Sequence, residues 1–210
     1  MEPIGVGVIG CGYWGPNIAR NVARSEQCEL VAVCDIDINR AMRTGLEYRT
    51  PIVTDRVADV LDAKNVGLVV VATPSFTHHE VALAAIRSGK HVLVMKPLTT
   101  RVDHAEELCA LAMRQGVLLA VDHTFLFTGA VRKMKQLIDD GEIGELYYFD
   151  SVRINLGLIQ TDVNVLWDLA PHDVSIMDHL LGEEAISVSA IGAAHGGSPT
   201  ENIAYLTVQY

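Results

Sequence analysis

Short apolar runs alternate with amphipathic stretches along the first 122 residues of the chain. The apolar runs are typical of buried strands, and the stretches between them have helical spacing. Strands are expected at 4–9, 30–34, around 52, 66–72, 91–95 and 117–121, and helices at 14–24, 39–47, 57–61, 77–88 and 102–114. The valine-rich run at 66–72 predicts a strand that is buried on both faces. This alternation predicts an α/β fold with a doubly wound parallel sheet of the Rossmann type.

The pattern changes after Asp122. An amphipathic helix is expected at 128–140, a strand at 145–154, a helix at 168–181, and strands at 186–193 and 203–210. A long helix followed by several strands is typical of an α+β domain with an open, mainly antiparallel sheet. We therefore expect a Rossmann domain at 1–122 and a partial α+β domain at 123–210. Because the sequence stops inside the last strand pattern, we expect this sheet to be incomplete at its C-terminal end.

Composition restricts the kinds of partner. The formal net charge of the 210 residues is −10. An acidic chain lacks the clustered lysine and arginine that bind nucleic acid or an anionic membrane, so neither partner is expected. No apolar run reaches the roughly 20 residues of a membrane span, and no signal-peptide pattern opens the chain, so we expect a cytoplasmic protein. The four cysteines form no C-x-x-C pair and no zinc spacing, so we expect reduced thiols and no metal site.

A glycine-rich turn is the first candidate for chemistry. Residues 10–15 read Gly-Cys-Gly-Tyr-Trp-Gly, which fits G-x-G-x-x-G between a predicted strand and a predicted helix. Gly10 allows the tight turn, Gly12 lets a pyrophosphate approach, and Gly15 lets helix and strand pack closely. Tyr13 and Trp14 complete the turn and are counted with the expected cofactor-binding residues. The alternative is a glycine turn in an α/β protein that binds no dinucleotide.

Asp35 directly follows the second predicted strand. A carboxylate at this position accepts hydrogen bonds from the ribose hydroxyls of a dinucleotide and repels a 2′-phosphate. The expected cofactor is therefore NAD rather than NADP. Arg40 lies nearby in the sequence and would weaken that preference.

The carboxyl ends of the later strands carry further candidates, because ligands of such sheets bind at those ends. Thr73 and Pro74 follow one strand, with His78 just beyond them, and Lys96 and Pro97 follow the next. Pro97 favours an extended conformation for Lys96, from which a lysine can stabilise a developing alkoxide. The alternatives are a simple turn at Thr73, a solvated helical turn at His78 and His79 (the preferred interpretation for His79), and a surface lysine.

Asp168 and His172 form a second pair of candidates. Their spacing of four residues places them on one face of a helix, and Pro171 between them is expected in its first turn. Histidine moves protons near neutral pH, and Asp168 would orient the imidazole or bind a substrate hydroxyl. The alternative is a helix cap at Asp168 and a surface histidine.

Together these motifs resemble the Gfo/Idh/MocA family of NAD(P)-dependent oxidoreductases, which act mainly on sugars and cyclitols. The resemblance rests on the turn at 10–15, on 72–74 with His78, on GKHVLVMKPL at 89–98 and on DLAPHD at 168–173. Residues 163–167 with the last motif resemble the branch that oxidises or reduces sugar nucleotides, often at the sugar 3-position.

The resemblance implies roles for several residues. Lys96 matches the conserved lysine of the family, His172 its catalytic histidine, and Asp168 the partner acid. The glycine turn and Asp35 match its cofactor site. The implied activity is hydride transfer between nicotinamide and a hydroxyl or keto carbon of a sugar or sugar nucleotide. The second domain is implied to bind substrate and to form a homo-oligomer through its sheet.

Two departures leave alternatives open. The family motif is usually Glu-Lys-Pro, but Met95 stands at the glutamate position, and family members are considerably longer than this chain. One alternative is an NAD-binding protein without turnover, acting as a sensor or as a subunit completed by a partner. Another is an inositol or aldose dehydrogenase of the same family.

Overall fold

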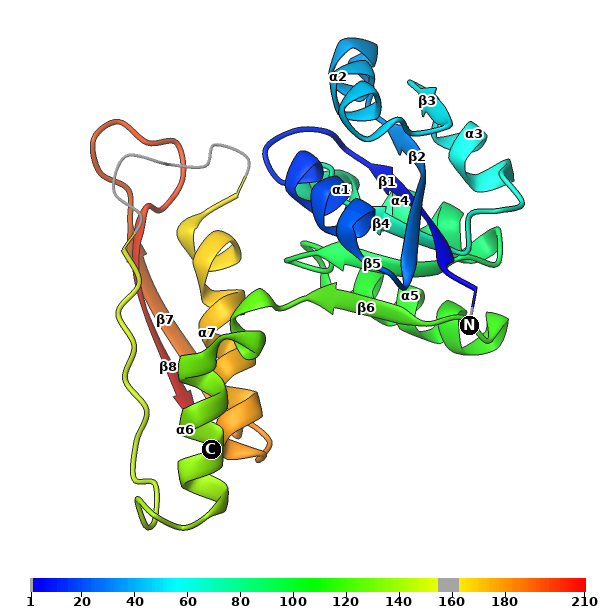
Figure 1. The fold of residues 1–210 in the computed structure, drawn as a ribbon. Coiled ribbons are helices and arrows are strands. Elements are labelled where there is room, and N and C mark those ends of the chain that lie inside the picture. The colour runs from blue at the N-terminus through cyan, green and yellow to red at the C-terminus, as the bar shows by residue number, and fades with distance from the viewer. Residues whose placement is uncertain (1, 155–162) are drawn as a thin grey trace. The chain divides into compact units, whose positions relative to one another are not determined.

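The computed structural model describes residues 2–154 and 163–210. Contacts between residues divide the chain into two compact units, Met1–Asp122 and His123–Tyr210. The first unit holds a parallel sheet between helices, and the second holds helices and an antiparallel pair of strands (Figure 1). In the described ranges no helix is both long and apolar enough to cross a membrane.

The first unit contains six parallel strands in the order β3-β2-β1-β4-β5-β6. The strands are β1 Ile4–Ile9, β2 Cys28–Cys34, β3 Ile52–Thr54, β4 Leu68–Val71, β5 His91–Met95 and β6 Leu119–Asp122. The helices are α1 Gly15–Arg24, α2 Ile38–Tyr48, α3 Val57–Asp62, η1 Ser75–Thr77 (a 3₁₀ turn), α4 His78–Arg87 and α5 Val102–Gln115. This strand order is that of the doubly wound Rossmann fold and confirms the predicted fold class.

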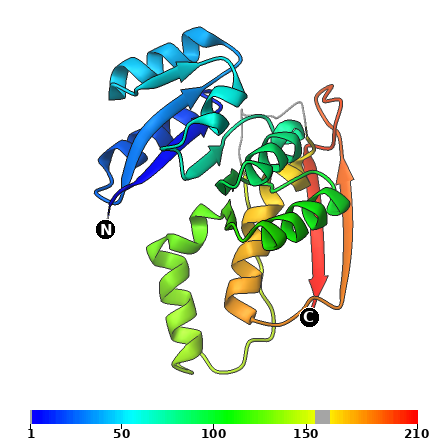
Figure 2. The same ribbon diagram turned by 90° about the vertical axis from the view of Figure 1, so that its right-hand side faces the viewer.

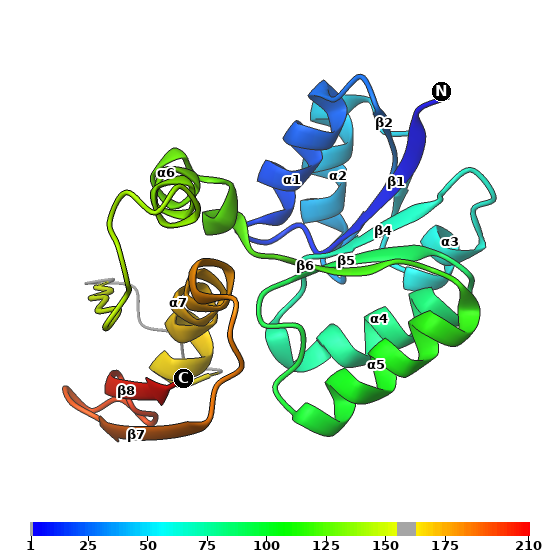
Figure 3. The ribbon, with the colours of Figure 1, turned by 90° about the horizontal axis from the view of Figure 1, so that it is seen from below.

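Two apolar layers hold this sheet. Helices α1 and α2 cover one face, and α3, α4 and α5 cover the other (Figure 3). In β4, Val69 and Val71 pack in one layer and Val70 packs in the other, as the two-residue period of a strand requires. All three are buried, so the prediction of a strand covered on both faces is confirmed.

The second unit contains η2 Thr124–Phe127, α6 Gly129–Asp139, α7 Val165–Leu181, β7 Ser187–Ala193 and β8 Ile203–Gln209. Strands β7 and β8 are antiparallel and run side by side in orange and red (Figure 2). A small core of Val131, Ile176 and Leu180 joins α6 to α7. The antiparallel pair agrees with the predicted second part of the fold.

The prediction of a strand at 145–154 is wrong. These residues are irregular, and within the described ranges they pair with no strand. Alternating apolar and polar residues describe the faces of a strand, but a strand also needs a neighbour that accepts its backbone hydrogen bonds. Here side chains attach the segment instead, because Ser151 and Arg153 both donate to the carboxylate of Asp173 in α7.

The prediction that Pro171 lies in the first turn of its helix is wrong. Helix α7 begins earlier, at Val165, where the side chain of Asn164 accepts a 3.2 Å hydrogen bond from the N–H of Trp167. Pro171 is therefore the seventh residue of the helix. It removes one backbone hydrogen bond, and a helix of 17 residues retains enough others on both sides to continue.

Candidate functional site

The glycine turn lies between β1 and α1, where close packing excludes side chains. Gly10 has a φ of +101°, and a Cβ there would come within 2.5 Å of the Ala72 backbone. A Cβ on Gly15 would collide with the carbonyl oxygen of Gly10. A Cβ on Gly12 would have no atom within 4 Å, so this part of the turn is open to an approaching ligand. These are the requirements of a turn that holds a pyrophosphate.

The start of α1 supplies donors for that anion. Trp14, the residue before the helix, makes no side-chain cap hydrogen bond within the described part of the chain. The amides of the first turn therefore remain for a phosphate, which the positive end of the helix dipole also favours. The side chains of Tyr13 and Trp14 are 77% and 52% exposed at this turn.

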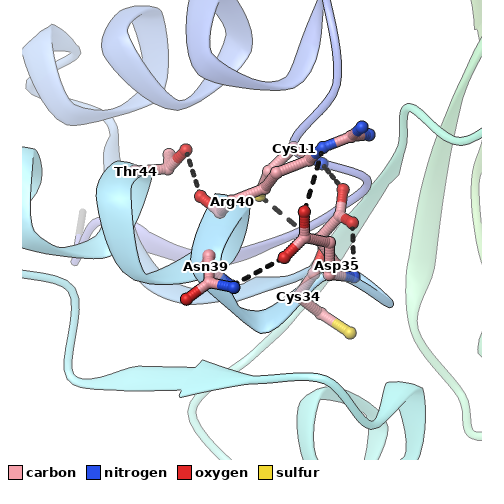
Figure 4. A network of polar contacts seen from close by, with 7 residues as sticks. Cys11, Cys34, Asp35, Asn39, Arg40 and Thr44 are labelled. Atoms are coloured by element: carbon pink, nitrogen blue, oxygen red, sulfur yellow. Dashed lines mark hydrogen bonds and ion pairs between the residues drawn. The ribbon is translucent and has the colours of Figure 1, made fainter.

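Asp35 is bound to the glycine turn. Its Oδ2 accepts a 2.6 Å hydrogen bond from the N–H of Cys11, and its Oδ1 accepts a 2.9 Å bond from the N–H of Asp37 (Figure 4). The side chain is 7% exposed, so these two bonds fix its orientation. Each carboxylate oxygen can accept more than one hydrogen bond, so the group keeps capacity for ribose hydroxyls.

The thiols beside Asp35 are not nucleophiles at neutral pH. Burial raises the pKa of Cys11 to about 11, with the nearby Asp35 adding to the rise and a hydrogen bond with Thr44 opposing it. Burial likewise raises the pKa of Cys34 to about 12. Both thiols therefore stay protonated and pack as small apolar groups.

His78 lies beneath the carboxyl ends of β4 and β5 rather than in a solvated turn. Its ring is 1% exposed. Nδ1 lies 2.7 Å from the carbonyl oxygen of Pro97, and Nε2 lies 2.9 Å from that of Thr73. The ring thus connects the loops that follow two neighbouring parallel strands. Both contacts are with backbone carbonyls of the loops that are predicted to bind the cofactor, so His78 holds these two loops together.

The loop residues around His78 are also held. The Oγ1 of Thr77 lies 2.7 Å from the Oγ1 of Thr73 and donates to the carbonyl of Pro74. Thr73 is half-buried and Pro74 exposed, at the edge where Rossmann folds bind ligands.

Lys96 follows β5 directly, is half-buried, and is joined to Pro97 by a cis peptide bond. Met95, at the position of the family glutamate, is paired in register with Asp122 of β6. His79 lies apart from this edge on the helix surface, where it contacts Glu107 at 2.8 Å and stacks on His104. The His79 side chain is 20% exposed, so it is less solvated than the helical turn preferred for it.

In the second unit, Asp168 lies in the first turn of α7 and His172 follows one turn later, both half-buried. The imidazole of His172 packs against the ring of Phe125, with centroids 4.7 Å apart and planes at 74°. The structure therefore keeps the predicted pair on one helix, while Lys96 belongs to the first unit.

Sequence reasoning missed a cluster around His172. Arg153 binds Asp173 through two hydrogen bonds of 2.9 and 3.0 Å, and its guanidinium lies 4.4 Å from the centroid of the Phe125 ring. Burial alone would raise the pKa of Asp173, but hydrogen bonds from Arg153 and Ser151 hold it below the ordinary value. Asp173 was visible as the last residue of the DLAPHD motif, but Arg153 was assigned to a strand that does not form.

The described residues hold no group of three or more histidine, cysteine, aspartate or glutamate side chains arranged to bind a metal ion.

Two family models match the chain. One, described as an oxidoreductase family with an NAD-binding Rossmann fold, covers residues 4–123, and the other, the GFO/IDH/MocA C-terminal domain, covers residues 131–210. The chain therefore belongs to the Gfo/Idh/MocA oxidoreductase family. Its first unit is an NAD-binding Rossmann domain.

Named relatives agree with this assignment. Inositol 2-dehydrogenase 2 of Saccharopolyspora erythraea is 33% identical over 189 residues, covering 88% of this chain and 56% of the relative. UDP-N-acetylglucosamine 3-dehydrogenase of Acidithiobacillus ferrooxidans is 31% identical over 192 residues, covering 90% and 58%. The solved structure of GenD2 from gentamicin A biosynthesis, in complex with NAD, matches with a TM-score of 0.85 at 25% identity, covering 99% of this chain and 62% of that one. The chain spans less than two thirds of the length of each.

Proposed function

We propose that this chain takes part in an NAD-dependent dehydrogenase reaction on a hydroxyl-bearing carbon of a sugar or sugar nucleotide. The observation that carries the proposal is the pair of hydrogen bonds on Asp35, which fix a carboxylate beside the glycine turn. A negative charge held there suits the ribose hydroxyls of NAD and opposes a 2′-phosphate.

The cofactor roles fall to the first unit. The amides at 12–15 and the start of α1 would bind the pyrophosphate, and Asp35 would accept hydrogen bonds from the adenosine ribose. Tyr13 and Trp14 are exposed beside the turn, and Thr73 and Pro74 lie at the neighbouring loop. Pro97 continues this edge after Lys96, and His78 supports both loops from below.

The chemical roles fall to Lys96, Asp168 and His172. When bound, nicotinamide supplies the hydride acceptor. In the oxidative direction, His172 takes the proton of the substrate hydroxyl, and Lys96 donates a hydrogen bond to the same oxygen and stabilises its growing negative charge. Asp168, one helical turn before His172, orients the imidazole or holds a second substrate hydroxyl.

The substrate class is argued from chemistry and from relatives. Relatives named as an inositol dehydrogenase and a UDP-N-acetylglucosamine dehydrogenase share a ring secondary alcohol as the reacting group. The resemblance of residues 163–173 to the sugar-nucleotide branch favours a sugar nucleotide. An inositol or a free aldose is the nearest alternative within the same family.

The second unit also supports association with another copy of the chain. Apolar side chains of its strand pair, Val188, Ile191 and Tyr205, are at least two-thirds exposed. An antiparallel sheet with exposed apolar residues suits a subunit interface, and a homo-oligomer through this sheet is part of the proposal.

A second candidate function is an NAD-binding protein without turnover, acting as a sensor or a partner-completed subunit. Met95 favours it, because a thioether replaces a carboxylate beside the lysine proposed for catalysis.

The test is NAD reduction by the purified chain across a panel of UDP-sugars, inositols and aldoses, with NAD binding measured in parallel. We expect NAD binding and turnover of at least one substrate, with His172→Asn lowering kcat by about 100-fold or more at little cost to NAD affinity. Full turnover by His172→Asn would remove His172 from its role. Binding of NAD with no turnover across the panel would favour the second candidate.

A further inference from the structure

Arg40 is placed where a Rossmann protein would hold the 2′-phosphate of NADP. It is the third residue of α2, shortly after Asp35, the acid that follows β2. An arginine in this region commonly accommodates that phosphate. Here, however, its Nε lies 3.5 Å from the Oδ2 of Asp37, and both side chains are about half exposed.

Asp37 is held at both its backbone and its side chain. Its N–H donates a 2.9 Å hydrogen bond to the Oδ1 of Asp35, and its own Oδ1 accepts a 3.0 Å bond from the N–H of Asn39. It is thus the N-cap of α2. Figure 4 shows Asp35, Asn39 and Arg40 gathered at this turn. Because the cap fixes one carboxylate oxygen, the other stays directed at Arg40.

The charges at the turn therefore favour a cofactor without a 2′-phosphate in two ways. A 2′-phosphate would meet the carboxylate of Asp35 and that of Asp37, and it would compete with Asp37 for Arg40. Like charges at short range oppose binding, and an arginine already paired offers less to a new anion.

We propose that Asp37 is a second specificity-determining residue for NAD, acting by holding Arg40 away from the 2′-phosphate. The inference rests on the proposed function, because it requires a dinucleotide to bind at the glycine turn with its ribose at Asp35.

The test measures the affinities of NAD and NADP by calorimetry, which needs no turnover. Asp37→Asn is the informative variant, because asparagine keeps the N-cap of α2 and loses only the charge. We expect it to tighten NADP binding by about 5-fold and to leave NAD within about 2-fold, the range that one exposed ion pair spans. In an Arg40→Gln background the gain should be clearly smaller, because the released guanidinium is then absent and only the lost repulsion from Asp37 remains.

A matched control lies in the same unit. Arg56 and Asp59 form an ion pair of the same spacing at the start of α3, with 3.6 Å between Nε and Oδ1. Asp59→Asn should leave the NADP-to-NAD affinity ratio unchanged.

The outcomes separate the two claims. An unchanged ratio in Asp37→Asn, or a gain of undiminished size with Arg40→Gln, would overturn the role given to Asp37. Failure of the wild-type chain to bind NAD would instead overturn the proposed function.

Discussion

At the residue scale, the carboxylate of Asp35 is the centre of the proposed cofactor site. Its two backbone hydrogen bonds connect the end of β2 to the glycine turn and to the start of α2. The sequence singled out Asp35 because the motif is followed by an acid after the second strand, and the structure places that acid against the glycine turn. The sequence could not predict the ion pair between Arg40 and Asp37. Spacing alone does not say whether an exposed guanidinium pairs with a neighbouring carboxylate or stays available to a phosphate.

The buried thiol of Cys34 leads to a prediction about alkaline stability. Its pKa is raised from 9.0 to about 12, so above pH 9 the unfolded chain loses this proton while the folded chain retains it. The unfolded state binds fewer protons in this range, so the free energy of unfolding must fall as pH rises from about 9 to 12. Cys34→Ala should reduce that fall, measured by urea unfolding at several pH values.

Cys109 provides the control for this experiment, because its thiol is exposed. Cys109→Ala should keep the wild-type pH slope. If the free energy of unfolding fell equally with pH in wild type and Cys34→Ala, the raised pKa of Cys34 would be contradicted.

At the element scale, His78 joins the loops after β4 and β5. A neutral ring donates from one nitrogen only, yet both nitrogens face carbonyl oxygens, so replacing the ring removes at least one buried hydrogen bond. His78→Phe should lower the free energy of unfolding by about 1–3 kcal/mol and raise amide hydrogen exchange at 73–77 and 96–98.

His79 is the adjacent control. Because its ring contacts Glu107 and His104 of α5 rather than the two loops, His79→Ala should leave exchange in those loops unaltered. Equal protection of both loops in wild type and His78→Phe would show that the ring does not hold them.

The irregular segment 145–154 is attached to α7 through Arg153. Its ion pair with Asp173 is partly buried, so Arg153→Ala leaves a carboxylate without its main partner. We expect a loss of about 1–3 kcal/mol in the free energy of unfolding and faster hydrogen exchange at 149–154. Because Arg153 also covers the Phe125 ring that contacts His172, the pH profile of any turnover should shift as well.

The exposed pair Lys135–Asp139 on α6 is the matched comparison. Lys135→Ala should cost about 0.5 kcal/mol or less. If Arg153→Ala lowered the free energy of unfolding by no more than Lys135→Ala does, other contacts would hold the segment 145–154.

The elements also show where sequence reasoning succeeded and where it failed. Strands of the parallel sheet were predictable, because runs such as Leu68–Val71 are apolar on both faces. The segment 145–154 had the alternation of a strand but lacked a neighbour, and neighbours are decided by the tertiary fold. The start of α7 was missed by three residues, because Pro171 outweighed the cap signal of Asn164.

At the scale of the whole molecule, the chain combines an NAD-binding unit with a second unit that carries the proposed proton-transfer residues. The chain spans 56% and 58% of the length of the two curated relatives named above. Its substrate and its assembly are therefore proposals. Lys96 and His172 come from different units, and the proposed reaction requires both to act on one substrate oxygen.

A crystal structure of the chain with NAD bound is the decisive test of the proposed function. We expect the pyrophosphate over residues 10–15, the adenosine ribose hydroxyls on Asp35, and nicotinamide C4 facing both Lys96 and His172. A dinucleotide bound away from the glycine turn, or a nicotinamide with neither Lys96 nor His172 near C4, would contradict it.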